Sequence, residues 1–138
     1  MLTKRALQIV ATVLLTLSFG QVVSAQWNQG RGGRWQYLGE SNVDGNRDHD
    51  KIKVGRSDGR FRSLRIEVER APIEFHRVVI HYANGEDEVL QLRDRIRAGS
   101  QSRVIDLRGR SREIESVEFW YAKASYQSQK PKVRLYGR

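Results

Sequence analysis

The stretch at residues 61–92, FRSLRIEVERAPIEFHRVVIHYANGEDEVLQL, constrains the fold more than any other part of the sequence. Apolar residues alternate with charged ones through Leu64, Ile66 and Val68, which is the two-residue period of a half-buried β-strand. The alternation then resumes with its parity shifted near His76, as happens at a β-bulge. The stretch therefore predicts two or three consecutive strands of an antiparallel sheet.

The dipeptide Asn84-Gly85 inside this stretch is a strong signal for a tight hairpin turn. A two-residue loop would place Val79 opposite Leu90, whereas a three-residue loop places Val78 opposite Leu90. Only the longer loop keeps the apolar side chains of the hairpin on one face. These are Val78, Ile80, Tyr82, Leu90 and Leu92. Because the hydrophobic pattern sets the register, we expect the three-residue loop, with Gly85 in the left-handed conformation.

Residues 1–25 have the composition of a secretory signal peptide. Lys4 and Arg5 supply the positive start, an apolar core follows at residues 6–17, and short side chains precede a cleavage point after Ala25. A transmembrane anchor is the competing interpretation, but the apolar run is short for a span of about 20 residues. We expect a bacterial protein that is periplasmic or secreted, with no transmembrane anchor after processing.

Cleavage would leave 113 of the 138 residues, a length suited to one domain with its own core. The chain has no cysteine, so an exported product would be held by packing alone, without disulfides or a cysteine-ligated zinc. The missing cysteine also excludes a lipid anchor of the bacterial lipoprotein kind. We expect a flexible glycine-rich lead-in at residues 26–34 and a single β domain at residues 35–138.

The two-residue period recurs outside the central stretch, and no convincing helical period follows residue 25. A first strand opens at Trp35 and closes at Gly39. Further strands are expected at residues 51–54, 104–107, 117–121 and 132–136. About seven or eight short strands indicate an all-β protein: a small single-domain antiparallel β-sandwich, or a barrel-like form of it, preceded by a signal-peptide helix.

Alternation within each strand also assigns side chains to the core or to solvent. Buried positions are expected at Ile66, Val68, Ile80, Leu90, Val117 and Phe119. Exposed positions are expected at Arg65, Glu67 and Glu118. The same alternation predicts that Trp120 and Tyr136 point outward. Their rings would then form a stacking platform for sugars or bases, or they would instead cover the second sheet.

No arrangement of nucleophile, base and orienting group is recognisable, so we expect neither an enzyme nor a cofactor. No serine lies at a strand-to-helix elbow, and the chain has no cysteine. His49, His76 and His81 lack metal-type spacing, and the last two fall on opposite faces of a regular strand. Carboxylate pairs for glycoside chemistry can be assembled in any acidic β domain, so a small hydrolase stays open as an alternative.

Oxygen-bearing side chains alternate in the segment after the first strand: Asp44, Asn46, Asp48 and Asp50. This spacing is similar to the start of a calcium-binding loop. An EF-hand would require glycine and glutamate where the chain has His49 and Gly55, and no helices flank the segment. A polar turn explains the same residues. We therefore expect no bound metal, with calcium as the alternative.

The chain carries 25 lysines and arginines against 16 acids, a formal net charge of +9, and loss of Lys4 and Arg5 with the signal would leave +7. Arginine predominates, which favours bidentate contacts with carboxylate, phosphate or sulfate groups. Two sets would line one end of the domain if their strands pair: Arg93, Arg95 and Arg97, and Arg108, Arg110 and Arg112. Such a patch would bind a polyanion, such as an anionic polysaccharide, lipopolysaccharide or extracellular nucleic acid.

Two alternatives to this polyanion hypothesis stay open. In the first, neighbouring acids neutralise the arginines locally, namely Asp94, Asp106, Glu113 and Glu115. In the second, the protein has a structural or interaction role and pairs with another envelope protein through an exposed strand edge. A salt-sensitive pull-down separates an electrostatic site from an edge-pairing interface, because only the former weakens steeply in salt.

Five segments follow one another along the chain in this order: WQYLGESNVDGNRDHDKIKVG, FRSLRIEVE, HYANG, RIRAGSQSRVIDLRG and VRLYG. In this order they resemble a bacterial domain-of-unknown-function family of small exported proteins, the YaaI-like group. The resemblance extends over about residues 35–137. It implies a secreted or periplasmic β protein without an assigned activity, and it implies no catalytic residues.

Overall fold

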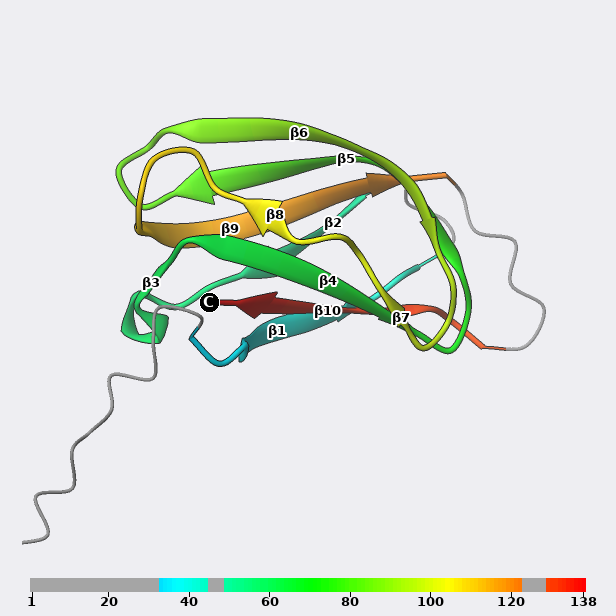
Figure 1. Cartoon of the computed structure of the whole chain (residues 1–138). Helices are drawn as coiled ribbons and strands as arrows, with labels where there is room; N and C mark the ends of the chain where they lie inside the picture. Colours follow the sequence, from blue (N-terminus) through cyan, green and yellow to red (C-terminus); the bar gives the residue numbers. More distant parts are fainter. Residues whose placement is uncertain (1–32, 45–48, 123–128) are drawn as a thin grey trace, which may run out of the picture. The chain divides into compact units, whose positions relative to one another are not determined.

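The computed structural model describes residues 33–44, 49–122 and 129–138, which form an all-β structure (Figure 1). The strands are β1 (Gln36–Asn42), β2 (His49–Lys53), β3 (Arg60–Phe61), β4 (Ser63–Glu69), β5 (Ile73–Tyr82), β6 (Asp87–Ile96), β7 (Ser100–Gln101), β8 (Ile105–Asp106), β9 (Arg112–Tyr121) and β10 (Lys132–Gly137). A single 3₁₀ turn, η1 (Arg56–Asp58), lies between β2 and β3.

Some expectations concern residues that the structure does not describe. The expected signal peptide at residues 1–25 lies outside the described residues, as does most of the expected lead-in at residues 26–34. Within the three described ranges, no helix is long and apolar enough to cross a membrane.

Two antiparallel sheets form the fold, and each has its own strand order. The first sheet runs β1-β10-β4-β7, with β8 also paired to β4. The second runs β2-β9-β5-β6, with β3 also paired to β9. Because each sheet ends in edge strands, neither closes into a barrel. The fold is the β-sandwich that the alternation predicted.

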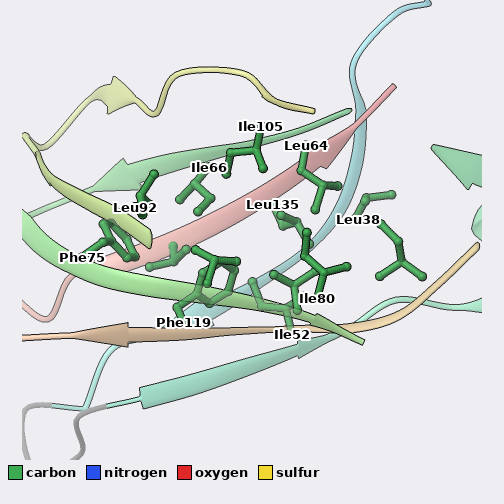
Figure 2. Packing of buried hydrophobic residues seen from close by; sticks show 14 of the residues in the cluster. Leu38, Ile52, Leu64, Ile66, Phe75, Ile80, Leu92, Ile105, Phe119 and Leu135 are labelled. Carbon is green, nitrogen blue, oxygen red and sulfur yellow. The ribbon is translucent and has the colours of Figure 1, made fainter. Parts of the chain in front are cut away.

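One apolar core lies between the sheets (Figure 2). The first sheet contributes side chains that include Leu38, Leu64, Ile66 and Leu135, and the second contributes Ile52, Phe75, Ile80 and Phe119. The rings of Phe75 and Phe119 meet edge-on with centroids 6.2 Å apart, a favoured aromatic geometry. Five of the six expected core residues are buried as predicted: Ile66, Val68, Ile80, Val117 and Phe119.

The hairpin between β5 and β6 has the predicted three-residue loop. Val78 pairs with Leu90, and the register continues to His81 opposite Asp87. The amide of Tyr82 then donates to the carbonyl of Glu86 at 2.9 Å, so residues 83–85 form the loop. Gly85 has a φ of +88°, the left-handed conformation that the loop requires.

The parity shift in β5 is a bulge at His76, as predicted. Phe75 and Arg77 both pair with β9 and with β6, but the register slips between them on both sides. Phe75 and Val78 are consequently both buried although they are three residues apart. The bulge therefore keeps both halves of the longest central strand facing the core.

Gly39 does not close the first strand, so that expectation was wrong. The register of β1 against β10 slips between Tyr37 and Gly39, and the strand then continues to Asn42. Gly39 lies close to the second sheet, where a Cβ atom would be 2.7 Å from Cγ2 of Ile52. The glycine permits a close approach between sheets and a bulge, rather than a turn.

The number of strands and four burial assignments also differ from expectation. The two-residue strands β3 and β7 were not expected, and they bring the number of described strands to ten. Leu90 is partly buried, because β6 is an edge strand with one neighbour. Arg65, Glu67 and Glu118 are also partly buried, because β4 and β9 are flanked on both sides.

Replacing Ile80 by alanine should lower the free energy of unfolding by about 2–5 kcal/mol, because the fully buried side chain leaves a cavity. Val89→Ala is the matched control, since Val89 is 53% exposed on the neighbouring strand. It should change the free energy of unfolding by less than about 0.5 kcal/mol. Urea unfolding curves measure both values, and similar losses for the two variants would contradict the assigned core.

Candidate functional site

Two segments that are distant in the sequence lie at the end of the sandwich that carries the β5–β6 hairpin (Figure 1). Their arginines line two neighbouring hollows there. One segment is residues 56–62, which contains η1 and β3, and the other is the β8–β9 connection at residues 107–111. Five of their arginines are exposed: Arg56, Arg60, Arg62, Arg108 and Arg110. We call these five residues the arginine end.

Backbone pairing brings the two segments of the arginine end together. β3 pairs with the start of β9, with Arg60 opposite Glu113, and the amide of Leu107 donates to the carbonyl of Arg62 at 2.9 Å. The guanidinium of Arg60 donates to the carbonyl oxygen of Ser111 at 2.6 Å and to its Oγ at 3.3 Å. Main-chain hydrogen bonds therefore fix the spacing between the arginines of the two segments.

Two open hollows lie among these arginines. One has a volume of about 590 Å³ and is lined by Arg62, Ser63, Asp106, Leu107, Gly109 and Arg110. The other has a volume of about 420 Å³ and is lined by Arg56, Arg60, Ala83, Asn84, Arg112 and Glu113. Both hollows are polar and rich in guanidinium donors, unlike the mostly apolar pockets that hold small organic ligands.

A buried carboxylate fixes the β8–β9 connection from the core side. Glu88 is only 5% exposed, and its Oε2 accepts hydrogen bonds from the hydroxyl of Tyr82 and from the amide of Arg108 at 3.0 Å. Burial raises the pKa of Tyr82, and the hydrogen bond to Glu88 raises it further, so the phenol stays a donor at neutral pH. These bonds anchor the backbone of Arg108 while its side chain remains exposed.

Arg112, one of the predicted binding residues, is engaged in contacts within the protein. Its guanidinium lies 3.8 Å from the ring centroid of Tyr82 and 2.5 Å from a carboxylate oxygen of Glu86. The hydrogen bond from Arg112 holds the pKa of the exposed Glu86 below its usual range, with a second contribution from Asn84. The side chain of Arg112 is 18% exposed. It supports the hairpin next to the arginine end.

The acids expected to neutralise the arginines do not pair with them. Within the described ranges, no ion pair joins a carboxylate to any residue of the arginine end. Asp106 lines one hollow, but its Oδ1 accepts a hydrogen bond from the hydroxyl of Ser63 at 2.8 Å. Asp58 likewise accepts from the amide of Gly55 at 2.8 Å. The exposed guanidiniums keep their charge available.

The two predicted arginine sets lie at opposite ends of β5, not at one end. Arg95 is opposite Glu74 near the start of β5, whereas Ile114, two residues after Arg112, is opposite Tyr82 at its end. A ten-residue strand spans roughly 30 Å. The expectation of a single patch was therefore wrong, because it assumed that neighbouring turns share an end.

The regular alternation expected along the first set is also interrupted. Arg93 has a φ of +38°, in the left-handed region, and the register of β6 slips between Gln91 and Asp94. Arg97 follows the last residue of β6. All three arginines of this set are exposed. A hollow of about 480 Å³ is lined by Arg93 and Arg95 together with Glu74, His76 and Asp94.

The aromatic rings expected to form stacking platforms are already in contact with neighbouring side chains. Trp120 is on β9, which lies between β2 and β5. The ring of His49 stacks on the ring of Trp120 with centroids 5.4 Å apart, and the guanidinium of Arg77 lies 4.1 Å from the centroid of Trp120. Tyr136 contacts Tyr37 edge-on at 5.8 Å and lies 5.6 Å from the guanidinium of Arg65. Trp120 is thus flanked on both sides within its own sheet.

His81 bridges two carboxylates on the outer side of the second sheet. Its Nδ1 lies 2.7 Å from Asp87 on β6, and its Nε2 lies 3.2 Å from Glu118 on β9. Lys51 and His49 of β2 also approach Glu118, at 3.9 and 3.6 Å. Burial lowers the pKa of His81, but the hydrogen bonds to Asp87 and Glu118 outweigh it and hold the pKa above its usual value.

The described residues do not bring a metal-binding set together. Across the described ranges, no group of three or more histidine, cysteine, aspartate or glutamate side chains is placed to hold a metal ion. Asp50 of the calcium alternative accepts a hydrogen bond from the hydroxyl of Tyr121 at 2.6 Å. Asn46 and Asp48 lie outside the described residues, so the calcium alternative stays a hypothesis.

Fold and site together define a basic β-sandwich module with an open, polar surface at one end. The chain belongs to the family described as Domain of unknown function (DUF2541), whose model matches residues 9–137. Membership of a family of this kind agrees with the resemblance seen in the order of the sequence motifs. No curated protein matches the chain.

A solved structure of AlgX from Pseudomonas aeruginosa is similar in fold, with a TM-score of 0.52 and 14% sequence identity. The match covers 78% of this chain and 27% of the AlgX chain. The likeness therefore concerns about a quarter of the larger protein. At this identity it shows the fold alone.

The bridge at His81 predicts a pH-dependent contribution to stability. Protonated His81 should stabilise the fold fully below pH ~6.5, which is the pKa of histidine in the unfolded chain. This stabilisation should be lost as the pH rises through the higher pKa of His81 in the folded protein. His81→Gln should therefore lower the free energy of unfolding at pH 5.5 by more than at pH 9. Urea unfolding across this range measures the difference. His76→Gln, at an exposed histidine, is the control. A pH-independent difference for His81→Gln would contradict the bridge.

Proposed function

We propose that this protein is an exported β-sandwich module that binds an anionic polymer of the cell envelope or its surroundings through the arginine end. It acts in this proposal as a periplasmic or secreted binding protein, not as an enzyme. The signal-peptide composition of residues 1–25 supports export. The order of motifs supports the finer grouping with the YaaI-like proteins. The polymer is an anionic polysaccharide, lipopolysaccharide or another polyanion.

One observation carries the binding proposal: five exposed arginines from two segments converge without a carboxylate partner in the described residues. Like charges held close together repel, and this repulsion opposes folding. Elsewhere on the described surface, cations such as Lys132 and Arg134 are paired with Glu40. An anionic ligand would relieve the repulsion at the arginine end and form bidentate contacts with its guanidiniums.

The shape of the site favours a polymer over a small anion. The arginines lie around two separate open hollows rather than one enclosed pocket. A single small anion would contact a few of them and would stay largely solvated. A chain with repeated negative charges can occupy both hollows, and release of its condensed counterions then adds to the affinity.

Edge pairing with another envelope protein is the second candidate function. β6 has ten residues and is paired on one side only among the described strands. Val89 on this strand is 53% exposed. A partner strand would add backbone hydrogen bonds along this edge, and such an interface would resist salt far better than the arginine end.

The proposal is tested with two double variants of equal net charge. Arg62→Glu with Arg110→Glu reverses two arginines of the arginine end, and Arg95→Glu with Arg97→Glu reverses two at the opposite end. The first should lower the affinity for a labelled polygalacturonate at least tenfold and flatten its dependence on salt, because roughly one ionic contact is lost per arginine. The second should lower the affinity less than threefold.

Thermal unfolding of both double variants shows whether each remains folded, as expected for exposed charges. Equal losses of affinity for the two would mean that only net charge matters. Wild-type binding no stronger than that of an unrelated protein of the same charge would overturn the proposal. Binding of polygalacturonate that persists in high salt would contradict an electrostatic site at the arginine end.

A further inference from the structure

The outer face of the first sheet carries an aromatic group where solvated polar side chains are usual. Tyr37 on β1 pairs with Tyr136 on β10, which pairs with Arg65 on β4, so the three form one row across the sheet. Trp35, just before β1, lies 4.5 Å from the guanidinium of Arg65 and 4.7 Å from that of Arg138. We call these five residues the aromatic row. Tyrosine and tryptophan are enriched at binding interfaces, because one end of each side chain is apolar and the other is polar.

The position of Tyr37 leaves one side of its ring open. β1 is an edge strand, so Tyr136 flanks Tyr37 from one side only, and the side chain of Tyr37 is 49% exposed. Trp120 differs, because strands on both sides of it supply side chains that contact its ring. Among the outward aromatic side chains of the described sheets, Tyr37 therefore has the accessible ring.

The arginines of the aromatic row lack the partners that other cations on this face have. Arg65 forms no ion pair within the described chain, and its Nε is buried without a hydrogen-bond partner. In the next row of the same face, Arg134 contacts both Glu40 and Glu69. The buried Nε is itself out of reach of a ligand, but the terminal nitrogens of this half-buried guanidinium also have no acceptor in the described chain and can donate to one from outside.

The aromatic row is continuous with the arginine end. The carbonyl of Arg138 accepts hydrogen bonds from the amides of Arg62 and Ser63, at 2.7 and 3.1 Å. The ring of Trp35 is in contact with the guanidinium of this same Arg138. The hollow at Arg62 and the aromatic row therefore adjoin at Arg138.

We propose that the aromatic row is a sugar-binding subsite, and that the anionic polymer is an acidic polysaccharide. This inference rests on the proposed function of the arginine end. The C–H face of a sugar ring would stack on Tyr37, and a carboxylate of the same or the next unit would accept hydrogen bonds from Arg65. The combination of a half-exposed ring and an unpaired guanidinium matches a ligand that has both a ring face and a negative charge.

The acids beyond the aromatic row favour a polysaccharide over a nucleic acid. Glu40 and Glu67 lie in the next row, on either side of Arg134. Sugar hydroxyls donate hydrogen bonds to carboxylates, so an acidic polysaccharide can continue over this row. The sugar units of such a polysaccharide keep free ring hydroxyls as donors to these carboxylates, whereas the sugar-phosphate backbone of DNA offers none.

The test compares three probes: polygalacturonate, inorganic polyphosphate and single-stranded DNA. Tyr37→Ala should lower the affinity for polygalacturonate about tenfold, the effect of one lost stacking contact. It should lower the affinity for polyphosphate, which has no ring, less than twofold. Val89→Ala removes an equally exposed apolar side chain from the other sheet and should change neither affinity.

A second pair of variants keeps the charge constant. Arg65→Lys should weaken binding of polygalacturonate, because a lysine cannot reproduce the planar guanidinium, whereas Arg134→Lys should not. Unchanged polygalacturonate binding in Tyr37→Ala and Arg65→Lys would overturn the subsite. If the arginine-end variant still lost binding, the proposed function would stand without it. A selective loss of DNA binding in Tyr37→Ala would assign the aromatic row to nucleic-acid bases and also overturn the inference.

Discussion

The register of β5 between β9 and β6 determines where the candidate binding side chains of this protein lie. Burial of Val78 and Ile80 against the opposite sheet fixes that register, and the bulge at His76 extends it to Phe75. At the end of β5, Tyr82 donates to the buried carboxylate of Glu88, which also accepts from the amide of Arg108. A slip by one residue would expose the core face and release the β8–β9 connection, so the arginine end depends on the packing of the central strand.

The pairing of charged side chains differs between parts of this structure. This difference is the basis for proposing a binding site at the arginine end. On the sheet faces, some cations are joined to carboxylates, as Arg134 is to Glu40 and Glu69. Such exposed pairs add little stability, but they cancel the local field. At the end of the sandwich, the exposed arginines have no such partners in the described chain, and the field there remains positive. The adjoining aromatic row adds a ring surface and the half-buried guanidinium of Arg65, which has no carboxylate partner in the described chain.

Local sequence patterns predicted what depends on neighbours in the chain. The alternation at Leu64, Ile66 and Val68 and the loop at Gly85 predicted the faces and the hairpin register, because side-chain parity and turn geometry are local properties. The arginine end depends instead on β3 pairing with β9, a contact between residues about fifty positions apart. Arg56, Arg60 and Arg62 were therefore missed, although the basic turn RSDGRFR that contains them was visible in the sequence. The left-handed Arg93 and the bulge before Gly39 were missed because non-local packing sets both conformations.

The most direct measurement for the central claim is a map of amide chemical-shift changes in the ¹⁵N-labelled protein during titration with an oligogalacturonate. The changes should concentrate at residues 35–37, 56–63 and 107–111, and they should diminish together as salt is added. These segments are far apart in the sequence and adjoin one another through the pairing of β3 with β9, the hydrogen bond from Leu107 to Arg62 and the carbonyl of Arg138. Changes centred on residues 93–97, or spread evenly over all exposed arginines, would contradict binding of the polymer at the arginine end and the aromatic row.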